Sequence, residues 1–141
     1  MKEVDVKILK IRISNFSFEL NDDYDAPKLD LKDDLSYDIG SEIRVHREKK
    51  QLDVKMIVII NTKEERKKII ELSIITSFEI KEIEKFEKDG EAIALPNDLI
   101  VKLLNICIAN LRGVLAVKVL ETGYKNIIIP LIDFSDKIHK K

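Results

Sequence analysis

The residue types that perform acid–base or nucleophilic chemistry are sparse in this sequence. It contains two histidines, His46 and His139, and a single cysteine, Cys107. His46 stands between Arg44 and Arg47 in a strand-like pattern, with no Ser or Cys nucleophile and no carboxylate at a recognisable spacing. His139 lies in a charged tail. The sequence therefore predicts no catalytic residues.

Metal and cofactor sites are equally poorly supported. The aspartate-rich stretch that begins at Asn21 lacks the turn glycine and the distal glutamate of a calcium-binding loop. The four glycines stand apart, so no phosphate-cradling loop is predicted. Cys107 lies inside an apolar helical pattern, where a cysteine usually packs as a small hydrophobic residue. We expect no cofactor, no metal site and no enzymatic activity.

Composition narrows the class of protein further. The chain has 141 residues, of which 45% are hydrophobic and 36% are charged, which is typical of one soluble domain spanning residues 1–141. Its 25 basic and 26 acidic residues nearly cancel, so no global field favours nucleic acid. A lone cysteine fits the reducing cytoplasm. Charges interrupt every apolar run before the ~20 residues of a membrane span, so we expect a cytoplasmic protein without membrane insertion.

Apolar alternation predicts four strands. The first, over residues 4–20, changes parity twice, and each change implies a bulge. A long connection over residues 21–39 precedes a strand over 41–48, and two further alternating runs cover 52–60 and 70–80. The length of the first connection indicates a crossover. We predict an α+β fold with a four-stranded antiparallel Greek-key sheet.

A long helix after Pro96 completes the predicted fold, with Asn97 or Asp98 as its cap. Its apolar residues cover roughly 220° of the circumference, more than one sheet is expected to bury. We therefore expect a second copy of the chain to cover the remainder. Asn110 lies within this apolar arc, where it either fixes helix register at an interface or bonds locally. The predicted oligomer interface comprises Leu99, Leu103, Ile106 and Asn110.

Several short segments resemble the SecB family of protein-export chaperones. They are Phe16–Asn21, Glu64–Ile80, Leu95–Asn97 and Gly123–Phe134, which occur in the family's order over residues 8–134. The resemblance implies a tetramer that is a dimer of dimers, binding of unfolded polypeptide along apolar grooves, and docking to the translocase motor SecA. We expect a homodimer or homotetramer. The tail is basic (Lys137, His139, Lys140, Lys141) where that of SecB is acidic, so the resemblance bears less on SecA than on the fold.

Two sets of binding residues follow. The resemblance and the outward face of the sheet assign partner docking to Asn15, Glu19, Ile69 and Glu71. Aromatic residues of the first strand and the crossover are candidates for client binding, although Phe16 and Phe18 are equally consistent with the core. The client-binding candidates are Phe16, Phe18, Tyr24 and Tyr37.

The leading hypothesis is an ATP-independent holdase chaperone that binds unfolded or non-native polypeptides, with a role in protein export left open. The alternative is an oligomeric adaptor, or a dedicated chaperone of an antitoxin, that docks a partner through the outward sheet face. Charge reversal at Glu19 and Glu71 would remove the partner of an adaptor and leave holdase activity unchanged.

Overall fold

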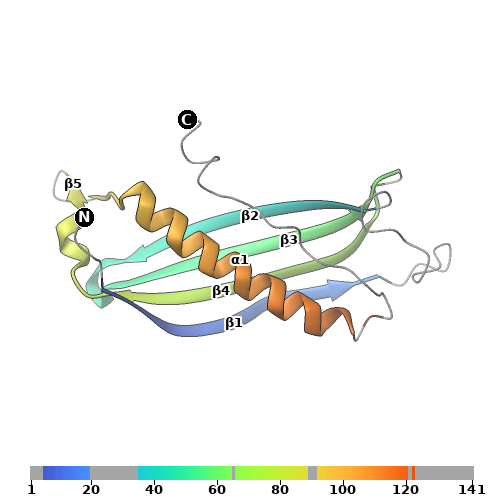
Figure 1. Ribbon diagram of the computed structural model, residues 1–141, viewed down its shortest axis with the longest axis horizontal. Helices are drawn as coiled ribbons and strands as arrows, with labels where there is room; N and C mark the ends of the chain where they lie inside the picture. Colours follow the sequence, from blue (N-terminus) through green and yellow to red (C-terminus); the bar gives the residue numbers. More distant parts are fainter. Residues whose placement is uncertain (1–4, 20–34, 65, 89–91, 121, 123–141) are drawn as a thin grey trace.

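The computed structural model describes residues 5–19, 35–64, 66–88, 92–120 and 122. These residues form an α+β fold in which one long helix packs on an antiparallel sheet (Figure 1). The strands of the main sheet are β1 (Val6–Phe18), β2 (Leu35–His46), β3 (Gln51–Thr62) and β4 (Lys68–Ile80). The remaining elements are the 3₁₀ turns η2 (Arg47–Lys49) and η3 (Ile83–Phe86), the short strands β5 (Glu87–Lys88) and β6 (Ala92–Ile93), and the helix α1 (Asn97–Val119).

The main sheet has the strand order β1-β4-β3-β2, and every pair is antiparallel. Strands β2, β3 and β4 follow one another as hairpins, whereas β1 lies beside β4 at the far edge. This is the predicted Greek-key arrangement, and it confirms the fold class. The first hairpin turns at Arg47–Lys49, and Lys50 adopts a left-handed conformation with φ of 53°.

The two central strands supply most of the core. Along β3, residues from Leu52 to Ile60 alternate strictly between the buried face and the outer face. Along β4, the same face carries Leu72, Ile74 and Phe78, which lie opposite Val58, Met56 and Leu52. Alternation with a period of two places one face of each strand against the core. The predicted inward residues of both strands are confirmed as buried.

Strand β1 contains two bulges at the positions where its apolar alternation changes parity. Its register against β4 shifts between Ile8 and Lys10 and again between Ile13 and Asn15. Each bulge inserts one residue and restores the apolar side chains to the face that carries the core. Without these insertions, Ile11 and Ile13 would point to the opposite face. The predicted bulges are confirmed.

Strand β2 begins earlier than the sequence indicated. The predicted start at residue 41 is wrong, because Leu35, Tyr37 and Ile39 already alternate toward the core and pair with β3. Gly40 therefore lies within the strand, opposite Ile57. A Cβ at Gly40 would lie 3.2 Å from Cγ2 of Ile57. The glycine leaves room for that isoleucine on the outer face.

Helix α1 begins directly after Pro96, and no side chain caps its first turn. The predicted capping by Asn97 or Asp98 is therefore wrong; Pro96 occupies the N-cap position with extended backbone angles. The helix continues without interruption through Arg112 and Gly113 to Val119, so it does not end at Gly113. By length and composition α1 is apolar enough to cross a membrane, but one of its faces is buried within this chain.

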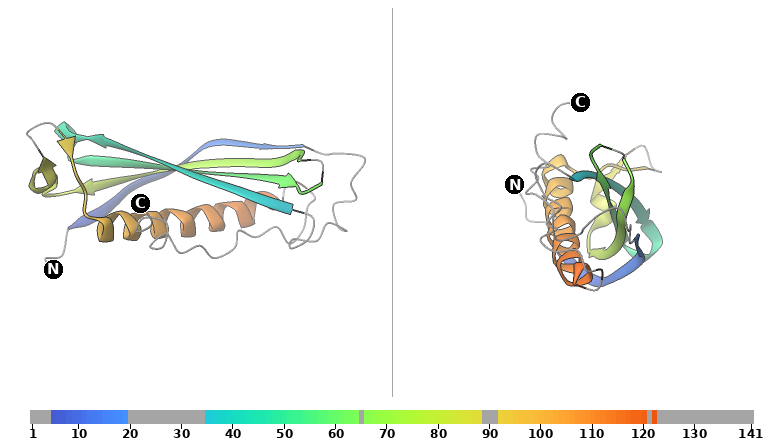
Figure 2. Two further views of the ribbon diagram at one scale, coloured as in Figure 1. Left: turned by 90° about the horizontal axis from the view of Figure 1, so that it is seen from above. Right: turned by 90° about the vertical axis from the view of Figure 1, so that its right-hand side faces the viewer.

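The helix crosses the sheet diagonally, packing mainly on β3 and β4 (Figure 1). The sheet twists strongly along its length (Figure 2), so it contacts more of the helix circumference than a flat sheet would. The residues of α1 buried in this way are Leu99, Leu103, Leu104, Cys107, Ile108, Leu111, Leu115 and Val119. The prediction that Leu99 and Leu103 lie at an oligomer interface is wrong, because both side chains belong to the core of the single chain.

Leu103 and Leu120 provide a test of this docking, because their side chains are 1% and 82% exposed, respectively. We expect Leu103→Ala to lower the free energy of unfolding by about 2–5 kcal/mol, because it leaves a cavity between helix and sheet. We expect Leu120→Ala to change it by about 0.5 kcal/mol or less. Urea unfolding at two protein concentrations measures both. A loss for Leu103→Ala that appeared only at the higher concentration would instead place Leu103 at an interface between chains.

Candidate functional site

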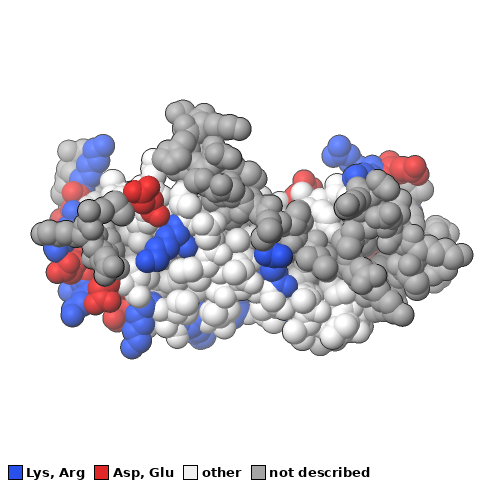
Figure 3. All heavy atoms as spheres, viewed as in Figure 1, with Lys and Arg blue, Asp and Glu red and all other residues white. Residues whose placement is uncertain are grey.

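An apolar strip on β1 is the main exposed hydrophobic feature of the described residues. Ile8, Ile11 and Ile13 are each 45% exposed, and Phe18 is 38% exposed. They lie opposite Phe78, Thr76, Ile74 and Ile70 of β4, so they face the same side of the sheet as α1. Figure 3 shows this side of the molecule. Away from the two ends and from the grey atoms, it has few charged side chains. We call Ile8, Ile11, Ile13, Phe16 and Phe18 the β1 strip.

The strip stays exposed because of where the helix lies. Strand β1 is an edge strand, and α1 packs mainly on its neighbours β4 and β3. Only the carboxyl end of the helix approaches β1, where the ammonium of Lys118 lies 5.5 Å from the ring centroid of Phe16. Isoleucines that alternate like core residues are therefore left half-exposed. The sequence pattern showed which face these isoleucines occupy. It did not show that no described element of the chain covers them.

The four predicted client-binding residues have different environments. Phe16 is half-buried against the core, and its ring centroid lies 5.8 Å from that of Phe18. Tyr37 is also half-buried against the core, and burial raises the pKa of its hydroxyl. Tyr24 lies outside the described residues. Among the three candidates that the structure describes, only Phe18 thus combines an aromatic ring with substantial exposure.

Three of the four predicted docking residues, Asn15, Glu19 and Glu71, lie at one end of the sheet. The side-chain amide of Asn15 donates a 2.6 Å hydrogen bond to Oε2 of Glu71, and the ammonium of Lys68 lies 3.6 Å from the other carboxylate oxygen. Glu19 is exposed at the end of β1. Because Asn15 and Lys68 engage both oxygens of Glu71, its charge is less available to a partner than the sequence indicated.

Ile69 cannot contribute to docking as predicted, because its side chain is only 1% exposed. The register between β3 and β4 passes from Ile60 opposite Ile70 to Asn61 opposite Lys68, which leaves Ile69 unpaired at a bulge. A bulge redirects the side chain of its extra residue. Here it brings Ile69 into the hydrophobic core.

The remaining two predicted interface residues lie at the margin of the helix–sheet contact. Ile106 packs partly against the core, and the side-chain nitrogen of Asn110 is buried without a hydrogen-bond partner in the described part of the chain. Nearby, Cys107 is fully buried, and burial raises the pKa of its thiol to about 11. The thiol therefore stays protonated at neutral pH, which favours the packing role predicted for it.

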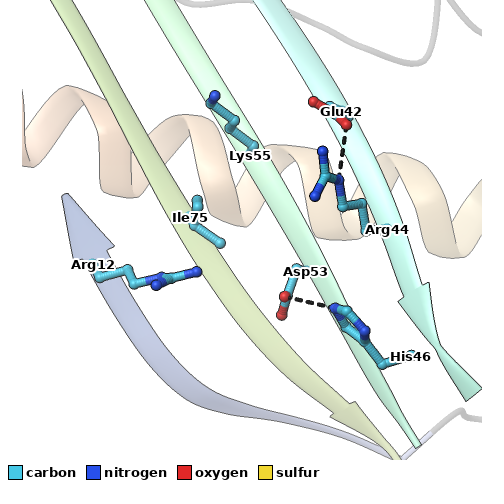
Figure 4. A pocket seen from close by; sticks show the side chains of 7 residues that line it. All are labelled: Arg12, Glu42, Arg44, His46, Asp53, Lys55 and Ile75. Carbon is cyan, nitrogen blue, oxygen red and sulfur yellow. Dashed lines mark hydrogen bonds and ion pairs between the residues drawn. The ribbon is translucent and has the colours of Figure 1, made fainter. Parts of the chain in front are cut away.

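The opposite face of the sheet carries a shallow hollow of about 290 Å³. Figure 4 shows its lining side chains, which come from all four strands: Arg12, Glu42, Arg44, His46, Asp53, Lys55 and Ile75. Two contacts organise the hollow: Nε of Arg44 donates to Glu42 at 3.0 Å, and Nε2 of His46 lies 3.0 Å from Oδ2 of Asp53. His46 therefore has a carboxylate neighbour, contrary to the sequence prediction, although Asp53 is seven positions away along the chain.

The carboxylate of Asp53 accepts several hydrogen bonds within this hollow. Partial burial raises its pKa, but hydrogen bonds from Gln51, Ser77 and His46 outweigh that effect and bring the pKa below its ordinary value. Gln51 donates to Oδ1 at 3.0 Å. The ionised form of Asp53 is thus the form that the folded chain stabilises.

Comparison with known proteins bears on the fold alone. No protein-family model and no curated protein matches the sequence. Among solved structures, the chain is similar to the Mycobacterium tuberculosis SecB-like chaperone Rv1957, which was solved in complex with a ChAD peptide from the HigA1 antitoxin Rv1956. The match has a TM-score of 0.62 and 10% identity, and it covers 90% of this chain and 87% of the other. The chain therefore has a SecB-like fold. A Streptococcus agalactiae protein of unknown function matches with a TM-score of 0.47 and 12% identity, over 93% of this chain and 99% of that one.

The hydrogen bonds of Asp53 predict a pH-dependent stability. Asp53→Asn should lower the free energy of unfolding at neutral pH by about 0.5 kcal/mol, a value reduced for solvent screening. Because the folded-state pKa is depressed, this contribution is present above the ordinary aspartate pKa. It is lost as pH falls through the lower folded-state value. Urea unfolding from neutral to strongly acid pH measures the convergence of variant and wild type.

Glu79 provides the control for Asp53, because it is exposed on the same face and its carboxylate has no hydrogen-bond partner among the described residues. Glu79→Gln should change the free energy of unfolding little at neutral pH. Equal stability of Asp53→Asn and wild type at neutral pH would show that the hydrogen bonds of Asp53 contribute nothing.

Proposed function

We propose that this chain is an ATP-independent chaperone that holds extended segments of non-native polypeptides on its β1 strip, without a catalytic site or a cofactor. The observation that carries the proposal is an apolar strip on an edge strand beside the helix. An edge strand presents unpaired backbone N–H and C=O groups to an incoming extended segment. The exposed isoleucines offer apolar surface to alternate side chains of that segment.

The energetics are consistent with a holdase. Completing the burial of one half-exposed isoleucine contributes about 1 kcal/mol. Several such contacts give binding that is selective for apolar segments and still reversible. Backbone pairing adds affinity that does not depend on the sequence of the client. Binding of this kind needs no nucleotide hydrolysis, because the apolar surface of the client is the driving force.

The related fold supports a polypeptide ligand. The Mycobacterium tuberculosis SecB-like chaperone was solved with a peptide from an antitoxin, and a peptide or unfolded segment is the type of ligand that the β1 strip fits. Protein export, docking to SecA, an antitoxin client and action in the cytoplasm stay predictions from the sequence.

Substitution within the strip tests the proposal directly. Ile8→Thr, Ile11→Thr and Ile13→Thr combined keep β-branched residues in β1 while removing apolar surface. In an aggregation assay with a chemically unfolded client, we expect the wild type to suppress aggregation at stoichiometric amounts. The triple variant should need about tenfold more protein, because it loses about 1.4 kcal/mol of apolar contact.

The matched control is Val45→Thr, which removes exposed apolar surface from β2, at the opposite edge of the sheet from the strip. This variant should protect the client as well as the wild type. Protection by the triple variant at wild-type levels, or no protection by the wild type itself, would overturn the proposal.

We also propose that the chain assembles into a homodimer or homotetramer. Val117 is 63% exposed near the end of α1, and Ile106 and Asn110 lie at the margin of the same helix. The exposed edge of β1 offers a second surface for pairing between copies. Light scattering at micromolar concentration should give two or four times the 16.3 kDa mass of the chain. A mass equal to one chain would contradict the proposal.

A further inference from the structure

The hollow on the outer face of the sheet is lined by three basic side chains, Arg12, Arg44 and Lys55, and by two carboxylates, Glu42 and Asp53. Glu42 pairs with Arg44, and Asp53 contacts His46. Arg12 and Lys55 line the same hollow, and neither forms an ion pair in the described part of the chain. Lys7 and Lys10 lie on the same face of β1, with Glu79 of β4 directly opposite Lys7. Cations therefore outnumber carboxylates at this end of the outer face.

Strand register places the two unpaired cations on either side of an apolar floor. Arg12 on β1 and Lys55 on β3 both lie directly opposite Ile75 on the intervening strand β4. Neighbouring strands are about 4.8 Å apart, so the two backbones are about 10 Å apart. In Figure 4 the side chain of Arg12 extends from β1 toward β4, and Ile75 lies between it and β3.

We propose that this hollow docks an acidic polypeptide segment in extended conformation, with two of its carboxylates paired to Arg12 and Lys55. Alternate side chains of an extended segment lie on one face about 7 Å apart. The long flexible side chains of Arg12 and Lys55 close the remaining distance. An apolar side chain or the backbone of the segment covers Ile75, which the structure leaves half-exposed between the cations.

The same features oppose a nucleic acid as the occupant. Glu42 and Asp53 line the hollow, and a continuous phosphate backbone would lie against both carboxylates. No Phe, Tyr or Trp faces outward from the described parts of the four strands to stack on bases. A peptide can place its few carboxylates beside the cations and neutral residues beside Glu42 and Asp53.

This site is independent of the proposed client surface. Arg12 alternates with Ile11 and Ile13 along β1, so its side chain leaves the opposite face of the sheet. The occupant would be a partner recognised by charge, whereas the β1 strip would recognise apolar surface. It also differs from the docking residues predicted from the sequence, because Asn15, Glu19 and Glu71 lie toward the other end of the face and favour the opposite charge.

Fluorescence anisotropy with a labelled peptide of alternating glutamate and valine, Gly-Ser-Glu-Val-Glu-Val-Glu-Ser-Gly, tests the proposal in about 50 mM salt. The full chain should bind this peptide and should not bind its glutamine counterpart. Arg12→Gln combined with Lys55→Gln should weaken binding at least fivefold. The conservative pair Arg12→Lys with Lys55→Arg should retain it, which separates a charge effect from misfolding.

Lys88→Gln combined with Lys102→Gln is the matched control, because it removes the same charge from exposed sites outside the hollow. It should bind within twofold of the wild type. Equal weakening by both pairs would show a net-charge effect and overturn the proposal. So would equal binding of the glutamine peptide, competition by inorganic phosphate at peptide concentrations, or tighter binding of an oligothymidine probe that also depends on Arg12 and Lys55.

A charge swap adds a gain of function. The variant with Arg12→Glu and Lys55→Glu should no longer bind the glutamate peptide and should bind the corresponding lysine peptide. Its circular dichroism spectrum should match that of the wild type, which shows that it is folded. Binding of neither peptide by this folded variant would count against direct pairing. The aggregation assay should be unaffected by Arg12→Gln with Lys55→Gln, so failure of this site and failure of the client surface can be distinguished.

Discussion

The structure depends on one packing constraint: a single helix covers a long, twisted four-stranded sheet. Because α1 crosses diagonally, it packs mainly on β3 and β4 and reaches β1 only near its own carboxyl end. Twist lets the sheet bury more of the helix than a flat surface would, which places Leu99 and Leu103 in the core. The uncovered area falls on the edge strand. Exposure of the β1 strip is therefore a geometric consequence of the arrangement.

Strand β1 can carry two different surfaces because its bulges keep its faces distinct. The insertions near Leu9 and Ser14 return isoleucine and phenylalanine to the helix side after each change of parity. Ser14 turns outward, where its hydroxyl lies 2.5 Å from that of Ser73. The outer side then carries Lys10, Arg12 and Asn15. Strand β1 thus carries apolar side chains on one face of the sheet and polar or charged side chains on the other.

Sequence patterning predicted the features that depend on local periodicity. Strict alternation in β3 and β4 and the parity changes in β1 were sufficient for the Greek-key sheet and its bulges. The pattern could not predict what covers a face: Ile11 and Phe78 alternate in the same way, yet only Phe78 is buried. It also missed the bulge at Ile69, because an apolar residue with outward parity looks the same whether it is exposed or redirected into the core.

The sequence alone could not predict the basic hollow, for a related reason. The two cations are 43 positions apart in the printed sequence, at Arg12 and Lys55, and become neighbours only through the registers of β1 with β4 and of β4 with β3. A near-zero net charge conceals such a local excess, because the cancelling carboxylates lie elsewhere. Partner recognition by charge on one face is therefore compatible with an apolar ligand on the other. Since alternate side chains of β1 leave opposite faces, occupation of one surface does not require displacement of the other.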